Sequence, residues 1–322
     1  MSAILVGTEH GIHVIAAPPS ESSGAGRAPA DAFQGRSIHA LVRGGALADG
    51  DGAIWALVDG REIWRVERTE AGLATALVAA SQAPDLRCLH PWNDVLLAGA
   101  AGAHLLRLQD GELHLVQPFE SVEGRETWGT PWGAPPDVRS IASSADGTLY
   151  VNVHVGGVVR SDDEGQSFLP TLPVDVDVHQ VVVPPSSRAR VVAATGMQGL
   201  AESTDHGRTW EYFTDGMHAT YCRAVTVADG TVLVSCSRGP SGKEAALYRR
   251  PLGAPRAVVF EHVREGVPEW HDDNIDTGCL DSIYTRVAYG TSSGEVFWSE
   301  DAGRSFRRAA SGLPGIRAVL IL

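Results

Sequence analysis

The chain of 322 residues is long for one ordinary domain, but all-β propellers routinely reach this length as a single unit. A hydrophobic content of 43% suffices for a packed core, and 36 glycines with 18 prolines indicate frequent turns. The formal net charge of -13 argues against a nucleic-acid binder, because neutralising phosphates requires a basic face.

The N-terminal segment contains two short apolar runs followed by a low-complexity stretch. Residues 4–8 and 12–16 are predicted strands, and residues 17–32, rich in small residues, are predicted to be a mobile loop. This segment lacks a positively charged start and an apolar run long enough for a signal peptide or a membrane span. We therefore expect a cytoplasmic protein with no membrane partner.

From residue 36 onward, pairs of strand-like runs recur, rich in the β-branched and small residues of buried strands. The first run of each pair falls at 36–44, 85–93, 138–144, 178–184, 221–228 and 275–282. The second run falls at 53–58, 95–101, 148–154, 190–196, 231–237 and 286–291. In the clearest unit, runs at 199–205 and 210–213 follow and complete four strands. Two insertions, 120–136 and 263–274, separate units of this pattern.

Three segments share the motif S-x-D-x-G-x-[ST]-[FW]. They begin at Ser161, Ser203 and Ser299. The motif suits a hairpin turn: its Asp can accept hydrogen bonds from the amides of its own turn, its Gly permits a positive φ, and its aromatic residue packs between sheets. We expect these aspartates to be structural rather than catalytic.

The spacing of the motif predicts a propeller. Ser161 and Ser203 are 42 residues apart, whereas Ser203 and Ser299 are 96 residues apart, or two steps of 48. One unit with a degenerate motif therefore lies between them, and a period of 40–50 residues of short strands is typical of propeller blades. The C-terminal run 315–322 supplies the first strand missing before residues 4–8, which gives seven units and leaves no open sheet edge.

The motif resembles the Asp box of sialidases and related BNR-repeat propellers, which include photosystem assembly factors of the Ycf48 type. The resemblance is carried by the motifs at Ser161, Ser203 and Ser299, and by strand pattern elsewhere. Together with the seven units counted above, it implies one domain over residues 1–322: an all-β, seven-bladed β-propeller with four-stranded antiparallel blades, whereas sialidases have six blades. The sialidase F/Y-R-I-P start is absent, and Tyr221, near Arg223, has no assignable Glu partner. A classical sialidase activity is therefore not expected.

The four cysteines, Cys88, Cys222, Cys236 and Cys279, show no C-x-x-C spacing, and each falls in a strand-like run. This pattern favours buried reduced thiols over disulfides or a zinc site.

Chemistry is expected at the face where each blade's first strand begins and its second strand ends. The pattern predicts that polar residues from several blades gather at the channel mouth on this face, joined by aromatic residues and a histidine of the two insertions. The predicted ligand-binding residues are His10, His39, Arg87, Arg139, Arg223, Arg317, Trp128, Trp132 and His271. Guanidinium groups bind carboxylates and phosphates, which favours a small anionic or carbohydrate-like ligand.

His154 ends the second strand of one blade, and His179 begins the first strand of the next. We expect both side chains to reach a common ligand, as metal ligands for a divalent ion or as catalytic residues of a hydrolase or lyase. Two alternatives stay open. The polar residues can form a ring of salt bridges around the axis, since an acidic residue precedes Arg87, Arg139 and His179 by two positions. The chain can also be a protein-interaction scaffold.

Overall fold

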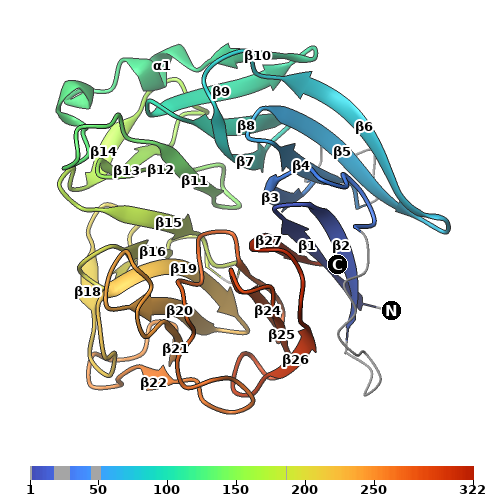
Figure 1. The fold of residues 1–322 in the computed structure, drawn as a ribbon. Helices are drawn as coiled ribbons and strands as arrows, with labels where there is room; N and C mark the ends of the chain where they lie inside the picture. Colours follow the sequence, from blue (N-terminus) through green and yellow to red (C-terminus); the bar gives the residue numbers. More distant parts are fainter. Residues whose placement is uncertain (1, 18–29, 45–51, 186) are drawn as a thin grey trace. The chain divides into compact units, whose positions relative to one another are not determined.

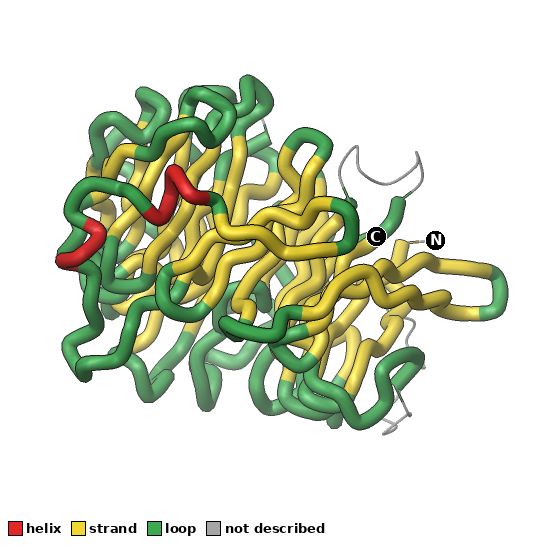
Figure 2. The backbone as a smooth tube through the Cα atoms, turned by 90° about the horizontal axis from the view of Figure 1, so that it is seen from above, coloured by secondary structure: helices red, strands yellow, loops and turns green. Residues whose placement is uncertain are grey.

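The computed structural model describes residues 2–17, 30–44, 52–185 and 187–322. Their strands form seven antiparallel sheets, which make up a seven-bladed β-propeller (Figure 1). Strands dominate these described residues, and helix within them is confined to α1 (Gln117–Glu120) and the 3-10 turn η1 (Arg125–Thr127) (Figure 2). The predicted fold class is confirmed.

Six of these sheets contain four strands that follow one another in the chain. The first three of them comprise β3 (Ile38–Arg43), β4 (Ile54–Val58), β5 (Glu62–Thr69) and β6 (Gly72–Ala80); β7 (Leu86–Trp92), β8 (Val95–Ala100), β9 (His104–Gln109) and β10 (Glu112–Leu115); and β11 (Val138–Ser143), β12 (Leu149–Val153), β13 (Gly157–Ser161) and β14 (Leu169–Leu172). The other three comprise β15 (Val178–Val182), β16 (Val191–Thr195), β17 (Leu200–Ser203) and β18 (Glu211–Phe213); β19 (Tyr221–Ala228), β20 (Thr231–Ser237), β21 (Ala246–Pro251) and β22 (Glu261–His262); and β23 (Leu280–Ile283), β24 (Arg286–Gly290), β25 (Val296–Ser299) and β26 (Arg307–Ala310).

The remaining sheet joins the two ends of the chain. Strand β27 (Ile316–Ile321) pairs antiparallel with β1 (Ser2–Thr8), which pairs in turn with β2 (Gly11–Ala17). Ile4 lies opposite Ile321 and Val6 opposite Val319, so the predicted pairing of the C-terminal strand is confirmed. This sheet has three strands among the described residues, and most of the predicted mobile loop 17–32 falls on residues 18–29, outside them.

The second strand of a blade is an apolar run because both of its faces are covered. Strands β4, β12, β16 and β20 are buried along their whole length. Their sequences (IWALV, LYVNV, VVAAT and TVLVSCS) are mostly apolar or small and do not alternate along their whole length, as expected for strands packed on both faces. The four cysteines are buried, and none of them forms a disulfide.

The chain divides into two compact units, each with its own core. The first unit consists of residues 1–41, 196–200 and 212–322, and its core includes Ile4, Tyr289 and Trp298. The second unit consists of residues 42–195 and 201–211, and its core includes Phe119 and Phe168.

The three S-x-D-x-G-x-[ST]-[FW] motifs occupy the turns between the third and fourth strands of three blades. In the second motif, Ser203 Oγ accepts a hydrogen bond from the Gly207 amide at 2.8 Å and donates one to Asp205 Oδ1 at 2.9 Å. The Thr209 amide donates to the same carboxylate oxygen at 2.8 Å. Gly207 has a φ of +73°, a region that favours glycine. The turns that begin at Ser161 and Ser299 repeat these bonds.

The aromatic residues that close the first two motifs pack against a neighbouring sheet, as the sequence predicted. Phe168 is buried with its ring 5.3 Å from that of Phe119, which follows β10 of the preceding blade. Trp210 donates from Nε1 to Thr171 Oγ1 in β14, 3.2 Å away. These two motifs therefore both close a turn and contact a neighbouring sheet.

Candidate functional site

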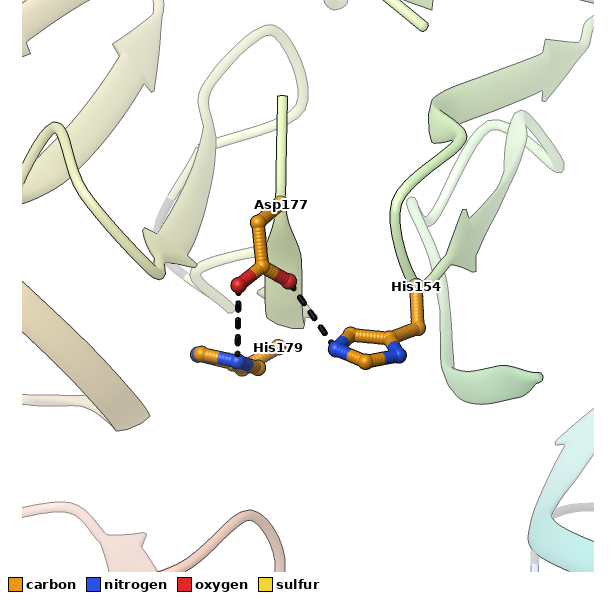
Figure 3. Close-up of side chains that lie close together, drawn as sticks. All are labelled: His154, Asp177 and His179. Carbon is orange, nitrogen blue, oxygen red and sulfur yellow. Dashed lines mark ion pairs between the residues drawn. The ribbon is translucent and has the colours of Figure 1, made fainter. Parts of the chain in front are cut away.

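Two histidines and an aspartate from neighbouring blades form a cluster in the second unit (Figure 3). His154 directly follows β12, Asp177 directly precedes β15, and His179 is the second residue of β15. Two hydrogen bonds hold the chain segments around the cluster. The His154 amide donates to the Asp137 carbonyl at 2.8 Å, and Asn152 Nδ2 donates to the Val178 carbonyl at 2.7 Å. The second of these bonds joins the end of β12 to the start of β15, the two segments that carry the histidines.

The three side chains meet at their polar atoms. His154 Nε2 lies 3.0 Å from Asp177 Oδ1, and His179 Nε2 lies 3.4 Å from Asp177 Oδ2. The two imidazole rings are stacked with centroids 5.6 Å apart, and the three ligand atoms lie within 4.8 Å of one another. His154 is 4% exposed and His179 0%, so both imidazoles are shielded from water.

The electrostatics of the cluster favour a charged carboxylate beside a neutral imidazole. Burial acts to raise the pKa of Asp177, but its contacts with His154 and His179 hold that pKa well below its usual range. Burial lowers the pKa of His154 despite the opposing contact with Asp177, and the charge of Arg139 lowers it further. An unprotonated imidazole nitrogen and a carboxylate are the states in which these groups bind metal ions.

Two other predicted site residues lie beside this cluster. The indole ring of Trp132, in the inserted segment 120–136, is 5.5 Å from the His154 ring and 64% exposed. Arg139, in β11, is close enough for its charge to lower the pKa of His154. The cluster therefore has an exposed aromatic surface on one side and a cation nearby.

Three predicted ligand-binding arginines instead form ion pairs. Arg87 Nε lies 3.1 Å from Asp137 Oδ2, Arg223 Nη1 lies 2.7 Å from Asp276 Oδ1, and Arg317 Nη2 lies 3.0 Å from Glu9 Oε1. Arg223 also donates to the hydroxyl of Tyr221 at 3.1 Å. These pairs correspond to the salt-bridge alternative of the sequence analysis at three positions.

The remaining predicted residues lie in different surroundings. Trp128 packs against Phe119, with the Arg125 guanidinium 5.0 Å from its ring. His271 is buried, and its Nε2 lies 3.2 Å from the Tyr289 hydroxyl. His10 is exposed in the turn between β1 and β2, and His39 is half-buried in β3. His271 in particular is enclosed by aromatic side chains, as expected for a core residue.

Asp177 is the member of the cluster that the sequence analysis assigned to salt bridges. The sequence feature that places Asp177 beside His179 is the spacing Asp177-Val178-His179, because residues two apart at the start of a strand project to the same face. Asp137 and Arg139 have the same spacing one blade earlier. What the spacing did not show is that the partner of Asp177 is an imidazole from the neighbouring blade.

None of the helices in the described parts of the chain is long and apolar enough to cross a membrane.

No protein-family model matches the sequence, and no curated protein matches it closely.

Solved structures do match the fold. A putative 6-phosphogluconolactonase from Bacteroides uniformis has 13% identity and a TM-score of 0.63, with 100% of this chain and 99% of that one covered. The WD40 propeller domain of Doa1 has 14% identity and a TM-score of 0.60, with 88% and 85% covered.

The GH74 enzyme of Niastella koreensis has 13% identity and a TM-score of 0.57. That match covers 84% of this chain but only 45% of the GH74 enzyme, so this chain spans less than half of its length. The neighbours thus include both enzymes and WD40 domains, and at these identities the likeness extends to the fold alone. This chain has the fold of a β-propeller.

Proposed function

We propose that this chain binds a divalent metal ion through His154, Asp177 and His179 and presents the ion to a small anionic or carbohydrate-like ligand. The observation that carries the proposal is the convergence of two imidazoles and one carboxylate within 4.8 Å. Among the described residues, no other group of three His, Cys, Asp or Glu side chains meets so closely.

The spacing of the three atoms supports a metal centre. Around a tetrahedral zinc ion with bonds of about 2.0–2.2 Å, neighbouring ligand atoms lie about 3.3–3.6 Å apart. His154 Nε2 lies 3.0 Å from one oxygen of Asp177 and His179 Nε2 lies 3.4 Å from the other oxygen, which is close to that range. Asp177 Oδ1 is buried, and its close contact is with His154 Nε2, an atom that can itself bind a metal ion when it carries no proton. Three protein ligands leave coordination positions for water or a substrate.

The surroundings support an anionic or ring-shaped ligand. The charge of Arg139 would favour a carboxylate or phosphate group near the metal. The exposed Trp132 ring offers a flat apolar surface on which a sugar or another ring could stack.

A metal ion in this position supports a hydrolase or lyase. It would lower the pKa of a bound water or polarise a substrate oxygen. The second candidate uses no metal: His154, oriented by Asp177, acts as a general base whose pKa is lowered by burial. Both versions place the chemistry at the same residues, and metal dependence separates them.

The matching hydrogen bonds of the three motif turns support membership of the Asp-box propellers, which we propose as the family of this chain. A cytoplasmic location is proposed from the sequence.

The third alternative is that the chain acts only as a protein-interaction scaffold. This alternative predicts that neither a metal ion nor a small ligand binds the cluster.

Metal titration of the apo protein tests the proposal. Calorimetry with Zn²⁺ and Mn²⁺, followed by elemental analysis of the dialysed protein, should give one bound ion per chain. The double variant His154→Gln/His179→Gln should lose this ion while its melting temperature in chelator stays nearly unchanged. His90→Gln, which changes a histidine in β7 bonded to Ser143, serves as the matched control. Equal binding by the double variant, or no binding by the natural sequence, would overturn the metal site.

A further inference from the structure

The outer strand of one blade differs from all other outer strands of the four-stranded sheets. Strand β6 has nine residues, whereas the corresponding strands have two to four. Those short strands carry a charged residue or a proline: Glu112, Pro170, Glu211, Glu261 and Arg307. Short length, charge and proline are the usual means by which sheet edges avoid pairing with other chains. Strand β6 uses none of them.

The edge of β6 is open over residues 72–77, whereas nearer its C-terminal end β6 lies close to Gly111 in the turn before β10. Its sequence, GLATALVAA, contains no charged residue and no proline. Residues 74–77 are exposed, and Leu77 is 53% exposed. Among the described residues, no backbone hydrogen bond joins residues 72–77 to a strand other than β5.

The tip of this hairpin also extends beyond its own sheet. Strand β4 pairs with β5 only as far as Val66, whereas β5 and β6 continue to pair up to Thr69 and Gly72 (Figure 1). A second chain could approach β6 here without meeting β4.

The sequence of β6 is symmetric about Thr75. Residues 73–77 read Leu-Ala-Thr-Ala-Leu in both directions. In an antiparallel pair of two such strands centred on Thr75, each Leu73 lies opposite a Leu77, and each Ala74 lies opposite an Ala76. The two leucines and Thr75 share one face of the strand, because alternate side chains project to the same side. A shift of the register by one residue would set leucine against alanine and break this match.

We propose that two copies of this chain associate through β6, paired antiparallel about a two-fold axis at Thr75. The pairing joins two four-stranded sheets into one of eight strands and removes the open edge. It covers Leu77 with the Leu73 of the partner, and no like charges face each other, since Glu70 falls opposite Ala80. This interface goes beyond the proposed function and needs no metal.

Charge pairs at the axis test this proposal, since an axial residue faces its own copy. The purified full-length chain should sediment as a dimer. Thr75→Lys alone and Thr75→Glu alone should each give a monomer, because like charges then lie directly opposite. An equimolar mixture of the two variants should restore the dimer, because Lys then faces Glu.

His114→Lys, on the exposed outer strand β10, provides the matched control and should stay dimeric. Circular dichroism checks that every variant is folded. A monomeric natural sequence, single variants that remain dimeric, or a mixture that remains monomeric would each overturn the proposed pairing. Protection of the amides of residues 73–77 from deuterium exchange should rise with protein concentration, and concentration-independent exchange there also contradicts it.

Discussion

Asp205 and Asp177 are both charged, well-bonded aspartates, but they obtain their partners in different ways. Asp205 accepts from Ser203 and Thr209, residues within four positions of it in the chain. Asp177 meets the side chain of His154, which lies 23 positions away and belongs to another blade. A local turn therefore holds the first carboxylate, and the packing of two blades holds the second.

This difference predicts which of the two aspartates contributes to stability and which contributes to ligand binding. The partners of Asp205 are hydroxyls and amides that satisfy one turn and leave little for a ligand to displace. The partners of Asp177 are imidazoles, whose nitrogens can bind a cation when they carry no proton. Asp205 is therefore expected to affect folding, and Asp177 is expected to affect metal binding.

The largest expected effect is on metal binding at Asp177. Asp177→Asn removes the anionic ligand and should weaken Zn²⁺ binding more than about a hundred-fold, beyond the usual effect of an outer-sphere partner. Asp205→Asn should leave the affinity unchanged. Calorimetric titration of both variants checks this, and a similar loss in both would erase the distinction between the two aspartates.

The next effect is the stability loss at Asp205. Asp205→Ala leaves the Thr209 amide and the Ser203 hydroxyl without their partner and should cost about 1–3 kcal/mol. The lower part of this range is expected, because Thr209 is exposed and its amide can turn to water. Urea unfolding in the presence of a chelator measures it, and an unchanged midpoint would show that the motif is dispensable.

A third effect is the pH dependence of folding stability that arises from His90. Burial lowers the pKa of His90 to about 4, and its Nε2 lies 2.9 Å from Ser143 Oγ in the next blade. Below its ordinary pKa of about 6.5, the unfolded chain takes up a proton that the folded chain refuses, so stability falls as the pH drops toward about 4. The loss from His90 is at most about 3 kcal/mol.

The motif turns should keep their contribution to stability over this pH range. Hydrogen bonds from Thr209 lower the pKa of Asp205 to about 2, so its contribution is present above about pH 4 and is lost only as the pH falls toward 2. Urea unfolding of the natural sequence and of His90→Gln at about pH 7 and pH 5 tests the assignment. An equally steep decline in the variant would show that His90 does not contribute.

The smallest effect is expected at Arg87. Its ion pair with Asp137 occupies the position that Asp177 occupies one blade later, but both partners are partly exposed. Arg87→Gln should therefore cost no more than about 1 kcal/mol and leave metal binding intact. A loss of metal binding in this variant would mean that the arginines and the cluster form one site.

Patterns within one strand or one turn were sufficient to predict most of the fold. The motif at Ser203 located its turn, and the run 315–322 identified the strand that pairs with residues 4–8. The segment between Ser203 and Ser299 was correctly predicted to hold a further blade, formed by β19 to β22. The positions of His154 and His179 on neighbouring blades also followed from the repeat.

By itself, then, the sequence determined the number of blades, their strands and the structural turns, because those features depend on residues close together in the chain and on a period that repeats. Only the tertiary structure decided which carboxylate meets which base. Arg87, Arg223 and His154 all lie at one end of their blades, yet the first two meet carboxylates as ion pairs and the third meets Asp177 beside a second imidazole. These pairings depend on side chains brought within a few ångströms by the packing of separate blades, and no spacing along the chain records such distances.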